Sequence, residues 1–492
     1  MPRSRSQHVP RWLTRVTGGF LRKPSAPSDV DDRLNVYRSR DRKRNEASSL
    51  PDGEALDLCC VWGVEFYTPT HLTGLIDALN NLGWDSKVDD GRHQNPVSWI
   101  RGLQRHRHGG ASLHLGVLTP TEGSVFFGVQ HHVAPLPSFV TYAKVRLYSV
   151  SPSLVGAVIC FVLEEEKAAA FNDIFNEEIQ TYTTPIRNGV RVHDPMSQKQ
   201  NDVRQLRENL STAIAAWFRE QLPGVFSSGT LDGKIPTCEL ITTRQAEPFP
   251  ADAEREALSS EYLRLLELDY NVDIWHSKRI PGLHFQNSRH ARHYSIVSIR
   301  EQECQAAMGE HYPSKEKRSR LWFLDETMSD MIVAWSILPL LEGYTQQVMK
   351  ARDAALAGSA SRKKTIGAFE AAGDSMLRGF DISAVAIELA EMAREKFWFF
   401  LDDPQFRGPS HAPTGSEVSL REQLHRSADD QAVWLQGIER GFREYSAQYG
   451  TLLGAKENIR LQKRITWLTV TLVVLAIAAV VVPVLGAKCG LW

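Results

Sequence analysis

The chain has 492 residues, of which 42% are hydrophobic and 23% are charged, so it can form two or three packed domains and is not an intrinsically disordered protein. Its formal net charge of -1 combines a basic beginning with an acidic remainder, because the first 50 residues hold 12 Lys/Arg against 5 Asp/Glu. The six cysteines are scattered and form no C-x-x-C pair, which argues against a disulfide-stapled extracellular domain and favours buried free thiols.

Residues 1–50 form a basic arm that we expect to be disordered over most of its length. It has no apolar stretch of signal-peptide length, so it does not predict export. Trp12, Val16 and Phe20 share one helical face beside arginines, which fits an anionic membrane surface and also resembles a mitochondrial transit peptide. An idle basic tail is the alternative, and the sequence does not decide whether the arm is a targeting segment.

Residues 51–320 carry the pattern of an α+β domain in the cytosol. Alternating apolar residues from Leu56 to Phe66 predict a strand, and the helix after it has Thr70 as its cap and Gly83 at its end. Four more strand-like runs follow with short gaps, at 113–117, 125–129, 139–150 and 154–163. Short gaps favour antiparallel pairing, so we expect a mixed or antiparallel sheet with helices.

Later elements of this domain are a long amphipathic helix at 200–222, another helix at 251–268, and strands at 237–242 and 294–299. An all-helical region is expected at 321–407, with helices at 325–356 and 363–401. The turn-rich segment 408–418 then predicts a linker. A stem helix should follow at 419–464, opening with the capping-box pattern of Ser419 and Glu422.

The segment from Ile465 to Ala487 contains no charged residue, and its length suffices to cross a hydrocarbon layer about 30 Å thick. We therefore expect one transmembrane helix there. Lys456, Arg460, Lys463 and Arg464 precede it and only Lys488 follows, so the positive-inside bias places the N-terminal bulk in the cytoplasm. The predicted partner is the lipid bilayer, and the protein is expected to be a single-pass membrane protein.

The stem has a heptad pattern that can self-associate. Its a and d positions are Leu435, Ile438, Phe442, Tyr445, Tyr449, Leu452, Lys456 and Ile459, spaced by alternating steps of three and four. Packing of this seam against the helices at 325–401 of the same chain is the alternative.

The interval from 274 to 300 has cations and aromatics but no acid. We consider Lys278, Arg279, Arg289 and Arg292 as candidate anion-binding residues, for a phosphate ligand or an anionic lipid. A solvated basic loop is the alternative. Catalytic and cofactor-binding residues stay unknown.

Histidines gather twice, at His106, His108 and His114 with nearby His131 and His132, and at His276, His284, His290 and His293. Neither group offers an H-E-x-x-H helix or a companion cysteine pair, so no metal site is predicted. Walker A, dinucleotide, kinase and EF-hand motifs are absent from the sequence, and no cofactor is predicted. The GDSM segment at 373–376 resembles the opening block of GDSL-type hydrolases, but Ser375 falls in a helical pattern and the D-x-x-H pairs precede it.

The first functional hypothesis is a membrane-anchored interaction or scaffold protein with unidentified protein partners. One alternative is an enzyme or an anion- or nucleotide-sensing module that uses the segment 274–300. Another is a homo-oligomeric channel or transporter, because the stem and membrane segment resemble those of CorA-type magnesium transporters. That family's second membrane helix and Gly-Met-Asn motif are absent, so no ion-pathway residue carries over.

Overall fold

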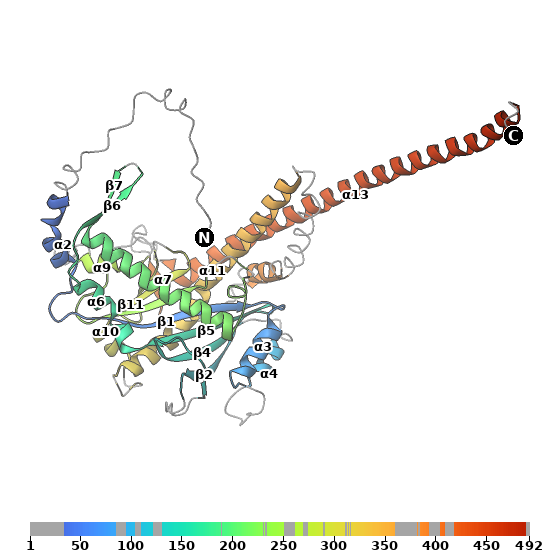
Figure 1. Ribbon diagram of the computed structural model, residues 1–492. Coiled ribbons are helices and arrows are strands. Elements are labelled where there is room, and N and C mark those ends of the chain that lie inside the picture. Colours follow the sequence, from blue (N-terminus) through green and yellow to red (C-terminus); the bar gives the residue numbers. More distant parts are fainter. Residues whose placement is uncertain are drawn as a thin grey trace.

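The computed structural model describes most of the chain from residue 34 onward. The described residues are 34–84, 95–103, 110–121, 130–187, 189–229, 231, 234–249, 261–268, 274–288, 291–309, 312, 314, 316–359, 381, 384–392, 404–408 and 418–488. Together they form a head of strands and helices from which one long helix projects (Figure 1).

A mixed β-sheet forms the centre of the head. Within the described residues it has 11 strands in the order β13-β12-β9-β10-β11-β8-β1-β5-β4-β2-β3. The pairs β8/β11 and β2/β3 are parallel, and the other pairs are antiparallel. The strands are β1 (Leu56–Tyr67), β2 (Ala111–Thr119), β3 (His131–Val133), β4 (Val140–Ser151), β5 (Leu154–Leu163), β8 (Thr237–Thr243), β9 (Ile274–Ser277), β10 (His284–Asn287), β11 (Tyr294–Arg300), β12 (Phe406–Gly408) and β13 (Val418–Ser419). The expected α+β class with a mixed sheet is confirmed.

Helices flank this sheet, and a separate hairpin stands beside it. The helices are α2 (Asp41–Ser48), α3 (Leu72–Asn81), α4 (Pro96–Leu103), α5 (Glu165–Ala168), α6 (Ala170–Asn176), α7 (Pro195–Gln221), α9 (Glu261–Leu265), α10 (Glu301–Ala307), α11 (Lys317–Ser359) and α13 (Leu420–Lys488). The hairpin pairs β6 (Tyr182–Ile186) with β7 (Gly189–His193). The strand predicted at 125–129, part of the helix at 251–268 and most of the helix at 363–401 fall outside the described residues.

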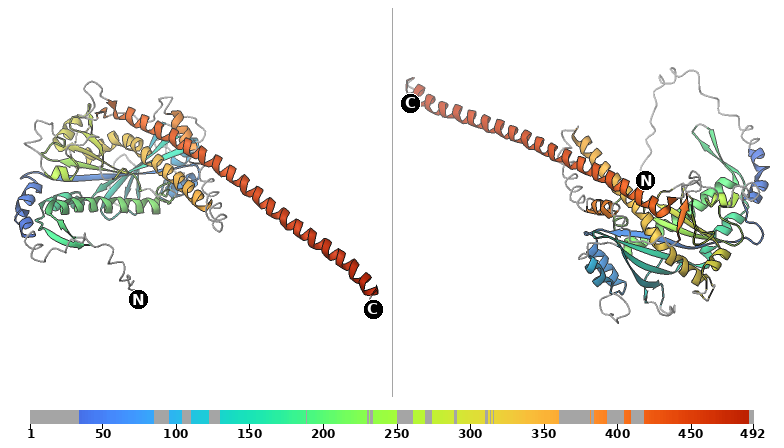
Figure 2. Two further views of the ribbon diagram at one scale, coloured as in Figure 1. Left: turned by 90° about the horizontal axis from the view of Figure 1, so that it is seen from above. Right: turned by 180° about the vertical axis from the view of Figure 1, so that it is seen from behind.

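The head has three layers, because α7 covers one face of the sheet and α11 the other (Figure 2). On the α7 side, a Cβ built on Gly63 would lie 2.8 Å from side-chain atoms of both Ile214 and Phe218, so glycine allows the helix to approach β1 closely. On the α11 side, Trp62 donates its indole N–H to Asp325 at 2.8 Å. Both faces of β1 are covered, which explains why almost all of its residues are buried.

The helix after β1 begins differently from the prediction. Thr70 does not cap it, since His71 occupies the position before α3 and Thr70 instead donates its hydroxyl to the Asp381 carboxylate. The helix ends as predicted, because Gly83 adopts a φ of 93°, which favours glycine.

Part of the predicted disordered arm is helical. The carboxylate of Asp41 in α2 accepts hydrogen bonds from the backbone N–H and hydroxyl of Thr181 at 2.7 and 2.5 Å. The Asn45 amide bonds to both backbone groups of Ile179, at 2.8 and 3.2 Å. These polar contacts hold α2 against the head. Because α2 has no apolar stripe, its sequence does not predict an amphipathic helix. Residues 1–33 lie outside the described part of the chain.

The region beyond 321 is not purely helical, which corrects the prediction. β12 pairs with β9, and β13 pairs with β12, so both strands extend the sheet at one edge. Phe406 in β12 is fully buried and its ring lies 6.1 Å from that of Phe285. Strands of three and two residues are too short for an alternating pattern to predict. The expected linker, 408–418, thus lies between two paired strands.

The last helix, α13, begins directly after Ser419, as predicted, and runs as one continuous helix to Lys488. Its first part packs along α11, where Leu435 is 0% and Phe442 is 6% exposed. Among the residues that the structure describes, no helix is long and apolar enough to cross a membrane. The transmembrane helix expected from Ile465 to Ala487 therefore stays a prediction.

Candidate functional site

The candidate anion-binding cations are not brought together among the described residues. Lys278 and Arg279 lie in the turn before β10, and Arg292 lies in the turn after it, so β10 separates them. Arg292 forms an ion pair with Glu342 at 2.9 Å. Arg289 lies outside the described residues. The cations are close in sequence, but the antiparallel path of the chain places them at opposite ends of one strand.

Histidines of the second group meet in one place. His276 in β9 and His284 in β10 are cross-strand neighbours with ring centroids 4.8 Å apart. Burial, with His276 nearby, lowers the pKa of His284 to about 3, so this ring is neutral at physiological pH. In the described part of the chain, no group of three or more His, Cys, Asp or Glu side chains could hold a metal ion. His106, His108 and His290 lie outside that part.

Nucleophile candidates offer no support for catalysis in the described head. Ser375 and the rest of the GDSM segment fall outside the described residues. The described cysteines are all buried thiols outside disulfides, as expected: Cys59, Cys60, Cys160, Cys238 and Cys304. Burial raises the pKa of the Cys60 and Cys160 thiols, which keeps them protonated and unreactive.

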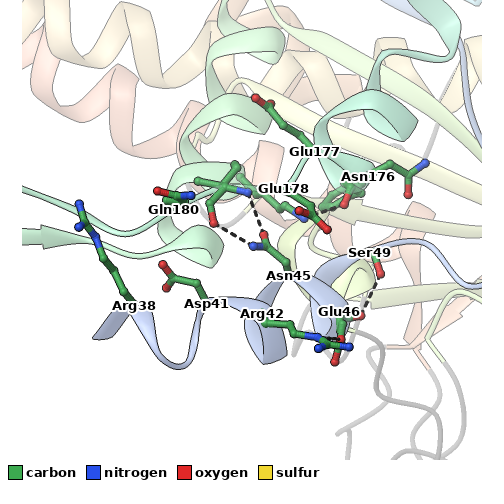
Figure 3. Close-up of a pocket in the computed structure, with 13 residues that line it drawn as sticks. Arg38, Asp41, Arg42, Asn45, Glu46, Ser49, Asn176, Glu177, Glu178 and Gln180 are labelled. Carbon is green, nitrogen blue, oxygen red and sulfur yellow. Dashed lines mark hydrogen bonds and ion pairs between the residues drawn. The ribbon is translucent and has the colours of Figure 1, made fainter. Parts of the chain in front are cut away.

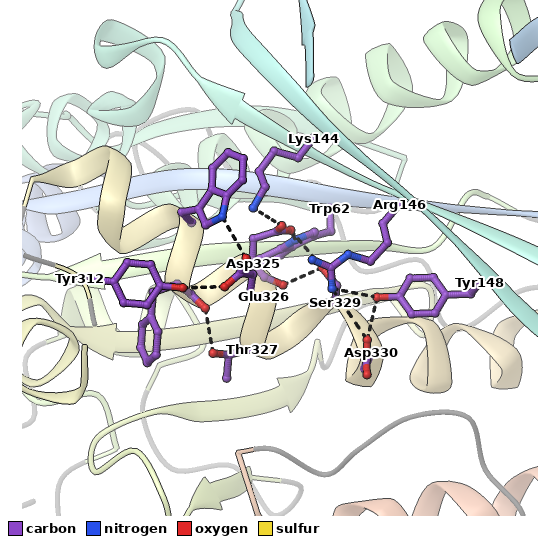
Figure 4. A network of polar contacts seen from close by, with 12 residues as sticks. Trp62, Lys144, Arg146, Tyr148, Tyr312, Asp325, Glu326, Thr327, Ser329 and Asp330 are labelled. Carbon is purple, nitrogen blue, oxygen red and sulfur yellow. Dashed lines mark hydrogen bonds and ion pairs between the residues drawn. The ribbon is translucent and has the colours of Figure 1, made fainter. Parts of the chain in front are cut away.

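A buried ion pair joins the sheet to α11 (Figure 4). Lys144 of β4 places its Nζ 2.5 Å from Oδ2 of Asp325, and the two side chains are 3% and 5% exposed. Asp325 Oδ1 accepts hydrogen bonds from the Trp62 indole at 2.8 Å and from the Ser329 hydroxyl at 3.0 Å. The Lys144 ammonium also lies 3.7 Å from the centre of the Trp322 ring. The charge of the Asp325 carboxylate is thus compensated inside this network.

The network continues toward the edge of the same face. The Tyr148 hydroxyl donates to Asp330 at 2.8 Å, and Arg146 lies 4.0 Å from the same carboxylate. Burial alone would raise the pKa of Asp325, but Lys144 and Arg146 outweigh it and lower that pKa to about 2. A permanently ionised, fully paired carboxylate suits a structural joint better than proton transfer, which needs a pKa near the working pH.

This network was not predicted from the sequence, although the sequence of β4 contains one indication of it. Lys144, Arg146 and Tyr148 occupy alternate positions of a largely buried strand, so all three point to one face. Cations on a covered face require acids opposite them. The partners, Asp325 and Asp330, belong to a helix far along the chain, and no local pattern identifies them.

A second buried network lies on the α7 face. Arg207 of α7 pairs with Glu239 of β8, and its Nη1 lies 3.7 Å from Oε1 of Glu267. The Tyr294 hydroxyl donates to the other oxygen of Glu239 at 2.8 Å. Burial raises the pKa of Glu239, against the effect of Arg207. This network connects α7 to the sheet, and the Lys144–Asp325 network connects α11 to the opposite face.

A polar hollow of about 650 Å³ lies between α2 and the segment after α6 (Figure 3). Its wall contains cations such as Arg38 and acids such as Glu178. Lys199 also lines it, is fully buried, and donates to the backbone oxygen of Phe175 at 2.6 Å. Burial lowers the pKa of Lys199, opposed by Glu177. Because its wall carries charges of both signs, the hollow suits a small polar molecule better than a simple anion.

The most unusual surface of the described chain lies on α13. Its large apolar side chains are exposed from position 459 onward, and the exposed residues do not keep to one face. They include Ile459, Leu461, Ile465, Trp467, Leu468, Val470, Leu472, Val473, Val474 and Leu475, with exposures from 49% to 73%. A soluble protein seldom exposes a contiguous apolar surface of this extent, because contact with water is unfavourable.

Comparisons with known proteins identify no relative. No protein-family model matches the chain, and neither a curated protein nor a solved structure matches it.

Proposed function

We propose that this protein is anchored in a membrane by residues 465–487 and holds its α+β head at the membrane surface as an interaction scaffold. The observation that carries the proposal is the exposed apolar surface of α13, where Trp467 is 73% and Leu472 is 65% exposed. Hydrocarbon is the environment in which a helix with apolar residues on all sides is stable. The side chains of residues 477, 478 and 480 onward lie outside the described part, and for them the proposal rests on sequence.

The stem sets the distance between head and membrane. Phe442 is the last residue of α13 with a buried side chain among those described, and Arg464 is the last cation before the apolar segment. A helix over residues 443–464 rises about 33 Å at about 1.5 Å per residue. We therefore propose that the stem is a spacer that presents the head to partners above the lipid headgroups.

Charge supports one orientation. Lys456, Arg460, Lys463 and Arg464 lie on the head side of the segment, and Lys488 alone lies beyond it. Cations are retained on the cytoplasmic side, so the head is proposed to be cytoplasmic. The same cations would bind anionic lipid headgroups, each contributing about 1 kcal/mol near a charged surface.

The arrangement of charged groups in the head favours a scaffold function over an enzyme or an anion-sensing module. Its two buried ion networks are internally paired, and the cations of the 274–300 segment are separated by β10. The polar hollow beside Lys199 is the one observation that favours ligand sensing, which makes it the second candidate. A channel has weaker support, since the sequence predicts only one membrane segment.

Extraction with sodium carbonate at alkaline pH tests the anchor, because it releases proteins held only by charge. We expect the full chain to stay with the membranes. The double variant Ala476→Lys with Val480→Lys should be released, since each lysine at the centre of a membrane helix costs about 2.5–3.5 kcal/mol. The matched control is Ala447→Lys with Thr451→Lys, at the same spacing on exposed positions of α13, and it should stay bound. Release of the unmodified chain, or retention of the central lysine variant, would overturn the proposal.

A further inference from the structure

The stem of α13 carries a stretch that does not suit exposure to water. From Tyr445 to Ala455 the sequence YSAQYGTLLGA contains no charged residue. A helix that stands alone in water normally carries charged side chains around most of its surface. Gly450 and Gly454 further lower the intrinsic stability of an isolated helix. A stem that stays helical over this stretch therefore needs a neighbour.

The apolar seam that α11 covers continues beyond the head. Inside the head the seam is buried, with Leu435 0% and Phe442 6% exposed. The heptad spacing then continues through Tyr445, Tyr449, Leu452 and Ile459. Ile459 is 55% exposed, and in Figures 1 and 2 α13 runs on past the end of α11 without another described element beside it. Among the seam residues whose side chains are described, Ile459 thus lacks the cover that Leu435 and Phe442 have.

We propose that a second copy of this chain covers the stem, so that residues 445–459 of two copies form a parallel coiled coil. The inference rests on the proposed membrane anchor, because two chains anchored in the same direction have parallel stems. Confinement to one membrane also raises the effective concentration of the stems and strengthens a contact that is weak in solution.

The residues that flank the seam fit a second copy. In the heptad register, the positions beside the seam are occupied by Ser446, Gln448, Leu453 and Ala455, none of them charged. Two identical helices therefore meet there without repulsion between like charges. Lys456 is the one cation within the seam, where it faces the same residue of the other copy. A single polar residue at such a position lowers stability but favours a two-stranded assembly with a defined register.

Single-cysteine crosslinking in membranes tests the contact. The full chain with Cys489→Ser is the background, because the described cysteines of the head are buried. Tyr445→Cys, Leu452→Cys and Ile459→Cys lie on the seam, whereas Ala447→Cys, Thr451→Cys and Asn458→Cys lie off it. Mild oxidation should give at least about tenfold more disulfide-linked dimer on the seam, because a disulfide requires β-carbons about 4 Å apart. Equal yields at all positions, no dimer, or adducts with another protein would overturn the inference.

A matched pair of variants then asks whether the seam holds the copies together. Leu452→Asp with Ile459→Asp places two charges on the seam, and Thr451→Asp with Asn458→Asp places the same charges one residue earlier. Co-purification of two differently tagged copies should be lost in the first variant and kept in the second. Retention in the seam variant, or loss in both, would contradict the inference. Membrane association is measured in the same samples, so that failure of the anchor is seen separately from failure of pairing.

Discussion

Changing Asp325 to asparagine should destabilise the head by about 3 kcal/mol, because it leaves the Lys144 ammonium buried without a counter-charge. The two side chains are 3% and 5% exposed, so solvent screens the pair very little. Asparagine keeps an oxygen that accepts from Trp62 and Ser329, and the change therefore isolates the charge. Lys144→Met should cost a similar amount, since it strands the carboxylate.

The pH dependence gives an independent measure of the same pair. The pKa of Asp325 is lowered from 3.8 to about 2, a difference that corresponds to about 2–3 kcal/mol. Because this pKa is lower in the folded protein, the stabilisation is present above pH 3.8 and is lost as the pH falls toward 2. The Asp325→Asn variant should lack this acid-dependent loss.

The double variant Lys144→Met with Asp325→Asn supplies the decisive comparison. Removing both charges removes the desolvation cost along with the attraction, so its stability should lie within about 1 kcal/mol of the unmodified protein. Urea unfolding followed by tryptophan fluorescence reports the change, since Trp62 and Trp322 contact the pair. The result would contradict this account if the losses of unfolding free energy in the two single variants add up in the double variant. A loss under about 1 kcal/mol in either single variant would also contradict it.

Two further predictions concern β1. Burial raises the pKa of Glu65 to about 7, against hydrogen bonds from the backbone of Phe226 and Ser227, so the folded state favours the protonated acid. Its stabilising effect is complete below about pH 4.5 and is lost as the pH rises through 7, so urea unfolding should show a loss of about 2–3 kcal/mol between pH 5 and pH 8. Glu65→Gln should remove that loss, and an unchanged pH profile in this variant would contradict the assignment. Gly63→Val should lower the free energy of unfolding by about 2 kcal/mol, since α7 leaves no room for a side chain. Gly74→Ala is its control, in open space on α3, and should stabilise the protein by up to about 1 kcal/mol. Equal effects of the two glycine changes would refute the close contact.

Long periodic elements of the fold could be predicted from sequence. β1, α7 and α11 each present enough apolar repeats for their type to be recognised, and both faces of the sheet need such elements for cover. β12 and β13 could not be predicted, because strands of three and two residues contain less than two periods of any pattern. α2 was missed for another reason, since Asp41 and Asn45 hold it by hydrogen bonds to a distant loop.

Candidate sites were harder to predict than the elements that carry them. Lys278, Arg279 and Arg292 cluster in sequence, yet the turns that hold them lie at opposite ends of β10. Lys144 and Asp325 are far apart in sequence, yet the packing of α11 on the sheet brings them into contact. Closeness in sequence therefore suggested a site for cations that are separated in the folded protein. It did not reveal the Lys144–Asp325 network, which forms only when α11 packs on the sheet.

Protection of Cys489 in sealed membrane vesicles tests the membrane anchor most directly. Cys489 follows the apolar segment, and the described cysteines of the head are buried. In vesicles with the cytoplasmic face outward, a maleimide that cannot cross membranes should label Cys489 only after detergent opens the vesicles, and Cys489→Ser should abolish that signal. Ser98→Cys, at an exposed position of α4, should be labelled in the sealed vesicles. Labelling of Cys489 in sealed vesicles, or of Ser98→Cys only after detergent, would contradict a single crossing with a cytoplasmic head.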